Sequence, residues 1–201
     1  MQARTVFLGG LLAVLGAEAG RADCLADFNA INSQRRDTAR YALEVSADVL
    51  SLEGSVVKHM ASSSLFDLTD GLRMKTSGLN TQADFILIGE EGWTLAAGQW
   101  TPMPAEQRTL ALQGVIADRY VYDRDAQDFE CPGEAAFEGK PHERFVFNQT
   151  VGVLESRVTA WFDPATRLPV AVVSNAEVNG YKVVATTRYR FDPAIRVEVP
   201  R

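Results

Sequence analysis

The sequence predicts an α+β protein made mainly of antiparallel β-sheet. Several runs alternate apolar and polar residues with a period of two, as strands with one buried and one solvated face do. Residues 158–173 are predicted to form a hairpin folded about a turn at 163–166. Residues 25–40 and 105–120 instead carry apolar residues at helical spacing. Such strands and helices bury their apolar faces by packing against each other, so we expect one domain.

Residues 1–22 have the composition of a secretory signal peptide. Arg4 precedes an apolar run at 6–15, and small residues follow that run. The run has 10 residues, whereas a membrane-spanning helix needs about 20, so a retained membrane anchor is the weaker interpretation. The sequence therefore predicts export from the cytoplasm.

The cleavage site is predicted to follow Ala22, with Ala19 as the second choice. Cleavage after Ala22 leaves residues 23–201 as a single mature domain. Asp23 comes directly before Cys24, where the signal of a lipoprotein has Gly or Ala. We therefore expect a soluble periplasmic protein that carries no lipid anchor.

The charge of the chain excludes some partners. The formal net charge is −6, and removal of Arg4, Glu18 and Arg21 with the signal peptide makes it more negative by one. Nucleic acids and anionic membrane surfaces both select clustered Lys and Arg, and this sequence has no such cluster. Neither is expected as a partner.

Two cysteines, Cys24 and Cys131, stand in a chain that is predicted to leave the cytoplasm. A disulfide between them is the natural inference. It would join the mature N-terminus to a predicted loop at 130–133, and closing so long a loop removes about 4 to 5 kcal/mol of unfolded-state entropy in the chain model. A redox pair is the weaker alternative, because such pairs usually have Cys-x-x-Cys spacing.

The first half of the chain begins with a helix and continues with strands. Residues 25–40 place Leu25, Phe28 and Ile31 on one thin apolar face. The strands that follow show either alternation or a Gly-bounded turn, and they lie at 41–46, 56–61, 72–77 and, as a hairpin, within 83–97. Pro102 and Pro104 are expected to end the sheet after 99–100, because proline cannot donate to a ladder.

The second half repeats this order. A helix is predicted at 105–120, where Leu110, Ala111 and Val115 have helical spacing. Strands are predicted around Phe145 and Phe147 and at 151–162, 170–173 and 183–191. In the turn between the second and third of these, Asp163 can accept backbone hydrogen bonds and Pro164 presets φ, which fits a type I turn.

The C-terminal half resembles the LolA-like family of periplasmic lipoprotein carriers, a superfamily that also includes mycobacterial lipid-carrying lipoproteins. The resemblance rests on the run 161–170, on 181–191 and on the ending 195–200. Residues 88–93 and 99–100, with the prolines after them, are similar to the middle hairpin of the family. These motifs are signatures of turns and strands rather than of chemistry.

The resemblance implies a strongly curved antiparallel sheet, an unclosed barrel, whose hollow is covered by helices and holds acyl chains. One position departs from the family pattern. Family members commonly have Gly after Asp-Pro-Ala-Thr, and this chain has Arg167 there. Either the turn is altered or Arg167 adopts a left-handed backbone at a cost of about 1 kcal/mol.

Large aromatic residues are the candidates for the wall of an acyl-chain cavity, because such pockets are mostly apolar with few polar groups. The candidates are Trp93, Trp100, Phe145, Phe147, Trp161 and Tyr189. Ordinary core packing is the alternative for each of them taken singly. As a set they are of interest, because a half-closed barrel cannot fill its own hollow as a sandwich does.

The sequence offers no good metal site or catalytic centre. Residues 123–134 space oxygen ligands somewhat like a calcium loop, but Asp128 stands where Gly is needed, so an acidic solvated loop is the better interpretation. His59 lies in a predicted strand and His142 in a predicted loop, and Ser62 to Ser64 are predicted to turn. Because no nucleophile or zinc motif accompanies the histidines, we expect no enzyme, no metal and no cofactor.

The predicted function is that of an exported carrier, a monomer that binds the acyl chains of a lipid or lipoprotein without covalent chemistry. A membrane donor or acceptor protein is a possible further partner. The alternative is a periplasmic protein-protein interaction module, in which the protein's own side chains fill the hollow and an exposed sheet edge recruits the partner.

Overall fold

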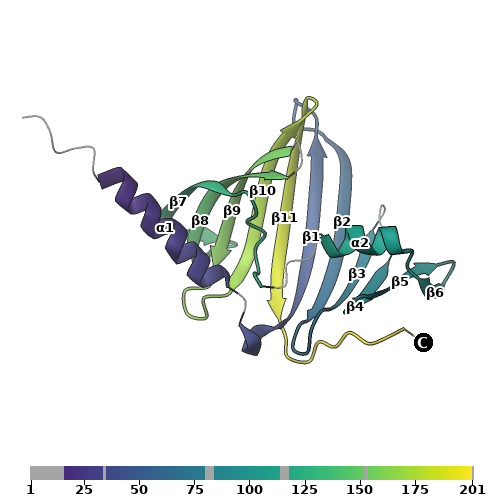
Figure 1. Ribbon diagram of the computed structural model, residues 1–201. Coiled ribbons are helices and arrows are strands. Elements are labelled where there is room, and N and C mark those ends of the chain that lie inside the picture. Colours follow the sequence, from purple (N-terminus) through teal and green to yellow (C-terminus); the bar gives the residue numbers. More distant parts are fainter. Residues whose placement is uncertain (1–15, 34, 80–83, 114–117, 152–153, 201) are drawn as a thin grey trace, which may run out of the picture.

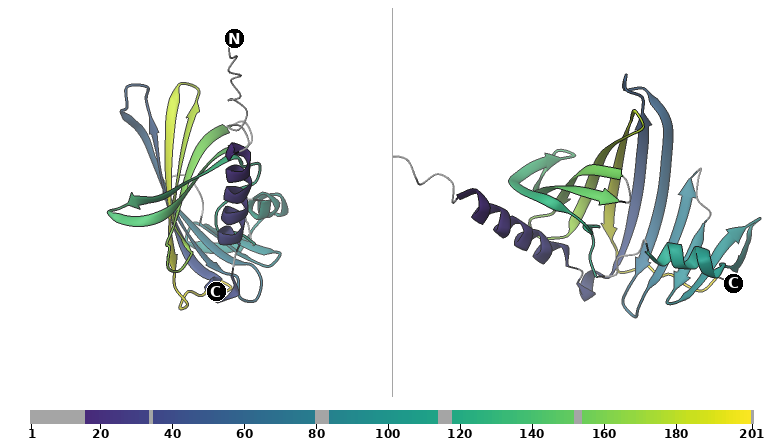
Figure 2. Two further views of the ribbon diagram at one scale, coloured as in Figure 1. Left: turned by 90° about the vertical axis from the view of Figure 1, so that its left-hand side faces the viewer. Right: turned by 45° about the horizontal axis from the view of Figure 1, so that its top comes forward.

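The computed structural model describes residues 16–33, 35–79, 84–113, 118–151 and 154–200. They form one antiparallel sheet of 11 strands in the order β6-β5-β4-β3-β2-β1-β11-β10-β9-β8-β7 (Figure 1). The sheet is strongly curved and does not close, so β6 and β7 are its two edges. Helices α1 and α2 lie on the same side of the sheet, its concave side (Figure 2). The predicted fold class, an unclosed barrel covered by helices, is confirmed.

The helices are α1 (Gly16–Asn32) and α2 (Ala105–Gln113), with a short 3₁₀ turn, η1 (Arg36–Thr38), between α1 and the sheet. The strands are β1 (Arg40–Leu50), β2 (Val56–Asp67), β3 (Arg73–Leu79), β4 (Phe85–Ile88), β5 (Glu91–Ala96), β6 (Gln99–Pro102), β7 (Gln127–Phe137), β8 (Lys140–Val151), β9 (Leu154–Phe162), β10 (Pro169–Val178) and β11 (Tyr181–Phe191). As expected, Pro102 ends the sheet at an edge strand, where a missing donor costs no ladder bond.

The first and last strands of the chain meet in the middle of the sheet. β1 pairs with β11, so that Tyr41 stands opposite Phe191 and Leu43 opposite Tyr189. Each half of the chain is therefore a meander of neighbouring hairpins, β1 to β6 on one side of this seam and β7 to β11 on the other. Residues that stand opposite each other share a face of the sheet, so these pairings decide which side chains face the helices.

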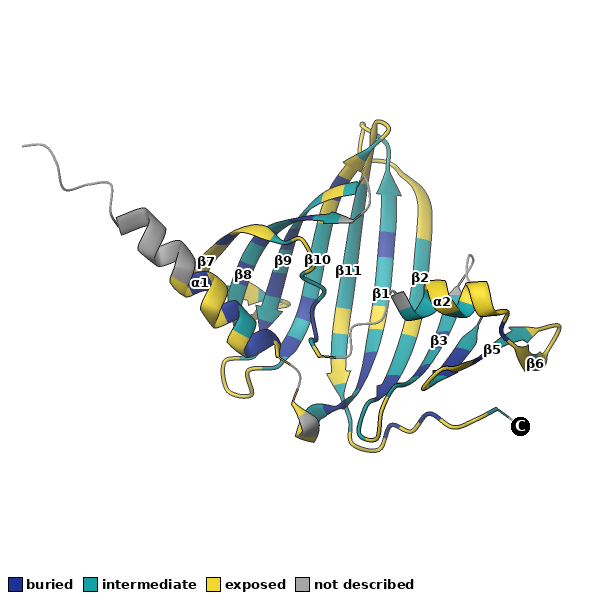
Figure 3. Cartoon of the chain, in the orientation of Figure 1, coloured by how far each residue is buried: buried dark blue, intermediate teal, exposed yellow. Residues whose placement is uncertain are grey.

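Phe28 of α1 fills the concave face over β7, β8 and β9. It is fully buried, and four phenylalanine rings surround it with centroid distances of 5.0 to 6.1 Å: Phe129, Phe145, Phe147 and Phe162. Figure 3 shows buried residues where α1 meets the neighbouring strands. Of the apolar face predicted for this helix, Phe28 and Ile31 are buried, whereas Leu25 remains 41% exposed.

The predicted disulfide is present and joins Cys24 of α1 to Cys131 of β7 across 107 residues. Cys131 lies in a strand, so the prediction of a loop at 130–133, and of a loop from 127 onward within 123–134, was wrong, although most residues of this strand are exposed as predicted. β7 is an edge strand with register shifts on both sides of Glu130, and these irregularities accommodate residues that interrupt regular pairing. The residues of this irregular stretch are of types that are common in loops, so the local composition indicated a loop.

The predicted hairpin turn between β9 and β10 is confirmed. Asp163 Oδ1 accepts hydrogen bonds from the backbone N–H groups of Ala165 and Thr166, at 3.0 and 2.7 Å. Arg167 has φ of 56° and donates its own N–H to the carbonyl of Asp163 at 2.7 Å. The arginine therefore takes the left-handed conformation that usually favours Gly, and the turn keeps its form.

Three local predictions were wrong because tertiary pairing overrides local pattern. The first helix ends at Asn32 rather than continuing to 40, and Arg40 opens β1. Ser62 to Ser64 lie inside β2, where Ser64 is 2.9 Å from Thr76 Oγ1 on β3. His142 is buried in β8 rather than placed in a loop.

The second helix is shorter than the predicted 105–120. It ends at Gln113, and Val115 lies outside the described residues. The apolar run 6–15 of the predicted signal peptide also lies outside them, so the signal peptide stays a prediction. Within the described part of the chain, no helix combines the length and the apolar character that crossing a membrane requires.

Candidate functional site

A cavity of about 230 Å³ lies on the concave face, near the seam between β1 and β11. Its walls are side chains of β1, β2, β8, β9, β10 and β11 and of the segment 120–122, which crosses in front of the sheet. The lining residues are Tyr41, Leu43, Val45, Phe66, Tyr120, Val121, Tyr122, Gln149, Val158, Val172, Ser174, Thr187 and Tyr189.

The strand register explains this lining. Leu43 and Val45 alternate with outward residues on β1, and they stand opposite Tyr189 and Thr187 of β11. Thr187 in turn stands opposite Val172 of β10. One row of side chains therefore runs across three strands on the helix side of the sheet, as the period of two requires.

Residues 120–122, which we call the crossbar, form the wall opposite the sheet and are pinned to the end of α1. Val121 donates its N–H to Asn32 Oδ1 at 2.7 Å and accepts from Asn32 Nδ2 at 2.9 Å. Tyr120 donates its N–H to the carbonyl of Asn32 at 3.1 Å. Asn32 is fully buried, so its amide has exchanged water for these partners.

The crossbar is also pinned to the sheet. The Tyr189 hydroxyl donates to the carbonyl of Tyr120 at 3.0 Å, and Gln149 Nε2 donates to the carbonyl of Tyr122 at 3.1 Å. The Tyr120 hydroxyl accepts from the N–H of Arg35 at 3.0 Å. The crossbar thus bridges β8, β11 and the α1–β1 connection, and it holds the cavity closed on the helix side.

The cavity is uncharged. Burial raises the pKa of the Tyr189 hydroxyl far above its usual range, and the neighbouring Tyr41 raises it further. Burial likewise raises the pKa of Tyr41, with a smaller contribution from Tyr120. Both phenols are therefore neutral at physiological pH, and no Asp, Glu, Lys or Arg stands among the described lining residues. This chemistry suits an apolar chain rather than a charged group.

Of the six aromatic residues predicted from the sequence, Tyr189 lines the cavity. Phe145 and Phe147 lie on the same concave face but are covered by Phe28, in the part of the hollow that α1 fills. They are 1% and 0% exposed, as core residues are. The structure thus brings three of the six to the helix side of the sheet.

The three tryptophans lie on the outer face, which points away from α1 and α2. Trp161 alternates with the inward Ala160 and Phe162, and its ring centroid is 4.7 Å from that of Phe137. Lys75 Nζ lies 6.0 Å from the ring centroid of Trp100. Trp93 stands opposite Ile86, and the next pair along these strands is Leu87 and Gly92, which are buried on the helix side. Because successive residues of a strand point to opposite faces, Trp93 faces outward. Contact of any of the six with a ligand stays a prediction.

Sequence reasoning missed the other half of the lining. The alternation of Tyr41, Leu43 and Val45 identified a strand with a dry face, and that signal marks one wall of the cavity. The crossbar left no such signal, because Tyr120 and Val121 are held by partners far away in the sequence. Their apolar character fitted a continuation of the predicted helix equally well.

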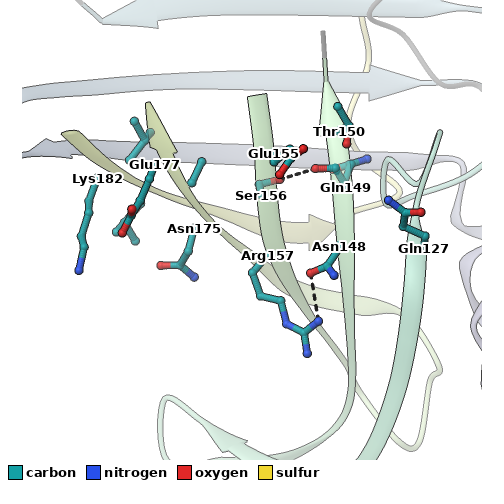
Figure 4. Close-up of a pocket in the computed structure, with 13 residues that line it drawn as sticks. Gln127, Asn148, Gln149, Thr150, Glu155, Ser156, Arg157, Asn175, Glu177 and Lys182 are labelled. Atoms are coloured by element: carbon teal, nitrogen blue, oxygen red, sulfur yellow. Dashed lines mark hydrogen bonds between the residues drawn. The ribbon is translucent and has the colours of Figure 1, made fainter. Parts of the chain in front are cut away.

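Two larger hollows lie on the outer face, and both are lined by charged side chains. One, of about 500 Å³, crosses β7 to β11 (Figure 4). Arg157 donates there to Asn148 Oδ1 at 3.1 Å, and Asn175, Glu177 and Lys182 line the same hollow. The other, of about 600 Å³, contains Glu44, His59 and Arg188. Walls that carry charged side chains do not suit acyl chains, so the concave cavity is the candidate site.

Comparison with solved structures places this architecture among known proteins. The lipoprotein LppX of Mycobacterium tuberculosis superposes with a TM-score of 0.52 over 88% of this chain and 99% of its own, at 8% identity. LprF of Mycobacterium bovis gives 0.49 over 91% and 97%, at 12% identity. A LolA superfamily protein of Nitrosomonas europaea gives 0.34 over 85% and 91%, at 9% identity.

No protein-family model matches the sequence, and no curated protein matches it. The likeness is therefore one of fold. An unclosed, curved antiparallel sheet with helices on its concave face, similar over most of its length to LppX, is a LolA-like fold. The resemblance predicted from the hairpin and strand motifs is confirmed at this level.

Proposed function

We propose that the protein is an exported carrier that holds an acyl chain of a lipid or lipoprotein in the concave cavity, without covalent chemistry. The observation that supports this most directly is the contrast between the hollows. The cavity under the crossbar has no charged side chain in its lining and is largely apolar, whereas each of the two larger hollows on the outer face is lined by several charged side chains. Acyl chains select the first environment.

Loading requires the cavity to widen. Its volume of about 230 Å³ is below the roughly 300 to 1,000 Å³ of typical ligand pockets. We infer that the crossbar moves, because it closes the cavity with hydrogen bonds from Asn32, Gln149 and Tyr189. Each such bond contributes about 1 kcal/mol net. Each CH₂ of the acyl chain that is buried contributes about 0.8 kcal/mol. This gain offsets the loss of the hydrogen bonds once several methylenes are enclosed.

The predicted signal peptide and the Cys24–Cys131 disulfide support a location in the periplasm, where disulfides form and persist. The prediction that the protein carries no lipid anchor still depends on the sequence, on Asp23 before Cys24. That it is a monomer is a separate prediction and part of the proposal. A carrier in that compartment takes its cargo from one membrane component and delivers it to another. A membrane donor or acceptor is therefore part of the proposal.

A second function is favoured by Phe28. Its packing among four rings fills one part of the hollow with the protein's own side chains. An interaction module would have a self-filled core of this kind and would bind a protein at a sheet edge. The edge strands β6 and β7 are the places where such a partner would add a strand.

The decisive experiment fills the cavity. Ser174 faces the cavity, whereas its neighbour Val173 faces outward, so Ser174→Phe and Val173→Phe form a matched pair. We expect the first variant to lose uptake of a fluorescent fatty acid at least tenfold and the second to keep it. Native mass spectrometry of protein purified from its own host should show bound lipid. Equal uptake by both variants, with no lipid in the native spectrum, would exclude the carrier.

A further inference from the structure

Exposed apolar side chains gather at the tips of two neighbouring hairpins. Seven large apolar residues are exposed among those the structure describes, and four of them lie at these tips. Leu52, Val56 and Val57 belong to the β1–β2 tip and are 74%, 60% and 55% exposed, and Tyr181 of the β10–β11 tip is 44% exposed. Such clustering marks an interaction surface.

The two tips lie side by side at one end of the sheet. Leu50, the last residue of β1, stands opposite Lys182 of β11. Figure 1 shows both hairpins reaching beyond the other strands at the top of the view, and Figure 3 shows their apex exposed. They therefore form one projection, which we call the paired tip.

We propose that the paired tip inserts shallowly into the interfacial layer of a zwitterionic lipid bilayer. The backbone of the tip is suited to this, because polar backbone groups must be satisfied internally where water is scarce. The N–H of Gly54 donates to the carbonyl of Ser51, and the N–H of Ser51 donates to the carbonyl of Ser55, each at 2.9 Å. Asn179 and Gly180 both have positive φ, as in a tight two-residue hairpin turn.

The side chains behind the apex fit the boundary between hydrocarbon and head groups. Lys58 stands opposite Val49, and Lys182 stands opposite Leu50, so the two ammonium groups come directly behind the apolar apex. Lysine stems pack along apolar matter while their charges reach phosphates. Tyr181 adds an amphipathic ring of the type that is enriched at membrane interfaces.

The charges of the paired tip balance, which selects the kind of bilayer. Lys58 and Lys182 are accompanied by Glu53 and Glu177, all four exposed, and behind them Asp48 is paired with His59 at 2.6 Å. An anionic surface attracts clusters of four or more basic residues, whereas the lysines of this surface are matched by at least as many carboxylates. A bilayer of zwitterionic lipid is therefore the partner whose chemistry the paired tip matches.

An apolar path connects the paired tip with the cavity. On the concave face of β1, Val49 and Ala47 lead from the tip to Val45, which lines the cavity. Val183 and Ala185 of β11 stand opposite them. A chain drawn from the bilayer has apolar contacts along this path. This last step rests on the proposed carrier function, whereas docking to the bilayer does not.

Flotation of the full-length mature protein with phosphatidylcholine vesicles tests the proposal. We expect the wild type to float with the vesicles and Leu52→Ser/Val56→Ser/Val57→Ser to lose at least tenfold in vesicle affinity. Leu110→Ser/Val199→Ser removes exposed apolar side chains elsewhere and should bind as the wild type does. Equal binding by the two variants, or no binding by the wild type, would overturn the proposal.

Insertion is checked by introducing tryptophan. Lipids brominated along the acyl chain should quench Leu52→Trp more strongly than Leu110→Trp, and equal quenching would contradict insertion. Binding to vesicles made from host membranes, but never to pure lipid, would overturn the proposal in favour of a protein partner. Docking and cargo binding are separable, because Ser174→Phe should float normally even if it takes up no fatty acid.

Discussion

Asn32, the last residue of α1, and Val121 of the crossbar exchange two hydrogen bonds across 89 residues of sequence, at 2.7 and 2.9 Å. One fully buried side chain thus satisfies both backbone polar groups of a residue that belongs to no strand. This pair is the joint between the helix that fills one part of the hollow and the segment that closes the cavity. It couples the stability of the fold to access to the site.

The first prediction concerns this joint. Asn32→Ala leaves the N–H and the carbonyl of Val121 without these partners, and each buried unsatisfied group costs about 1 to 3 kcal/mol. We expect the free energy of unfolding, measured with urea, to fall by about 2 to 4 kcal/mol. A fluorescent fatty acid should also dissociate faster, because the crossbar is released.

Asn29→Ala is the control for the joint. Asn29 lies on the same helix, and its Oδ1 accepts from Arg119 at 2.9 Å, but this bond is only partly buried. We expect a loss of less than about 1 kcal/mol there. Equal losses in the two variants would show that the crossbar is not held by Asn32.

The disulfide supports the second prediction. Cys24→Ser should lower the stability of the oxidised protein, by about 5 kcal/mol at most in the chain-entropy model. The fold should persist, because Phe28 anchors α1 independently of the cystine. Reductant should lower the Tm of the wild type to that of the variant. A further decrease in the reduced variant would mean that reduction acts elsewhere.

The turn carboxylate gives a pH-dependent prediction. Hydrogen bonds from the backbone N–H and the hydroxyl of Thr166 lower the pKa of Asp163 in the folded protein, and the N–H of Ala165 adds to this against slight burial. The ionised form therefore stabilises the hairpin above the unfolded pKa of about 3.9, and this contribution is lost as the pH falls through the lower folded pKa.

Asp163→Asn lacks this contribution at every pH. We expect the wild type to be more stable than the variant at pH 6, and the difference to shrink as the pH falls below about 4. Urea unfolding at a series of pH values measures it. A difference that stays constant from pH 6 to pH 2 would rule out the charged hydrogen bonds of Asp163 as the cause.

Local sequence predicted the features that local chemistry determines. Asp163 and Pro164 specify a turn through their own backbone preferences, and the alternation of Tyr41, Leu43 and Val45 specifies a strand. The disulfide followed from the compartment and the number of cysteines. Each of these signals lies within a few residues or in a simple count, so one sequence suffices to read it.

The site was harder to predict because strand register and long-range pairing decide it. A shift of one residue exchanges the two faces of a strand, and nothing local to Trp161 states that it faces outward while Phe162 faces the helices. The crossbar is held by Asn32, Gln149 and Tyr189, which lie on three separate elements. Aromatic composition identified candidates for the hollow without identifying their side of the sheet.

The last prediction separates a carrier from a self-filled module. Phe28→Ala removes a fully buried ring that four others surround, and such a change costs about 3 to 5 kcal/mol where the site cannot collapse. The void that remains adjoins Phe145 and Phe147 on the concave face. If this part of the hollow admits cargo, added fatty acid should raise the Tm of the variant more than that of the wild type, because a ligand that binds only the folded state stabilises it. Leu25→Ala, a change at an exposed position of the same helix, should behave as the wild type. A variant that loses stability and gains nothing from fatty acid would show that α1 is a permanent part of the core, as the interaction module requires.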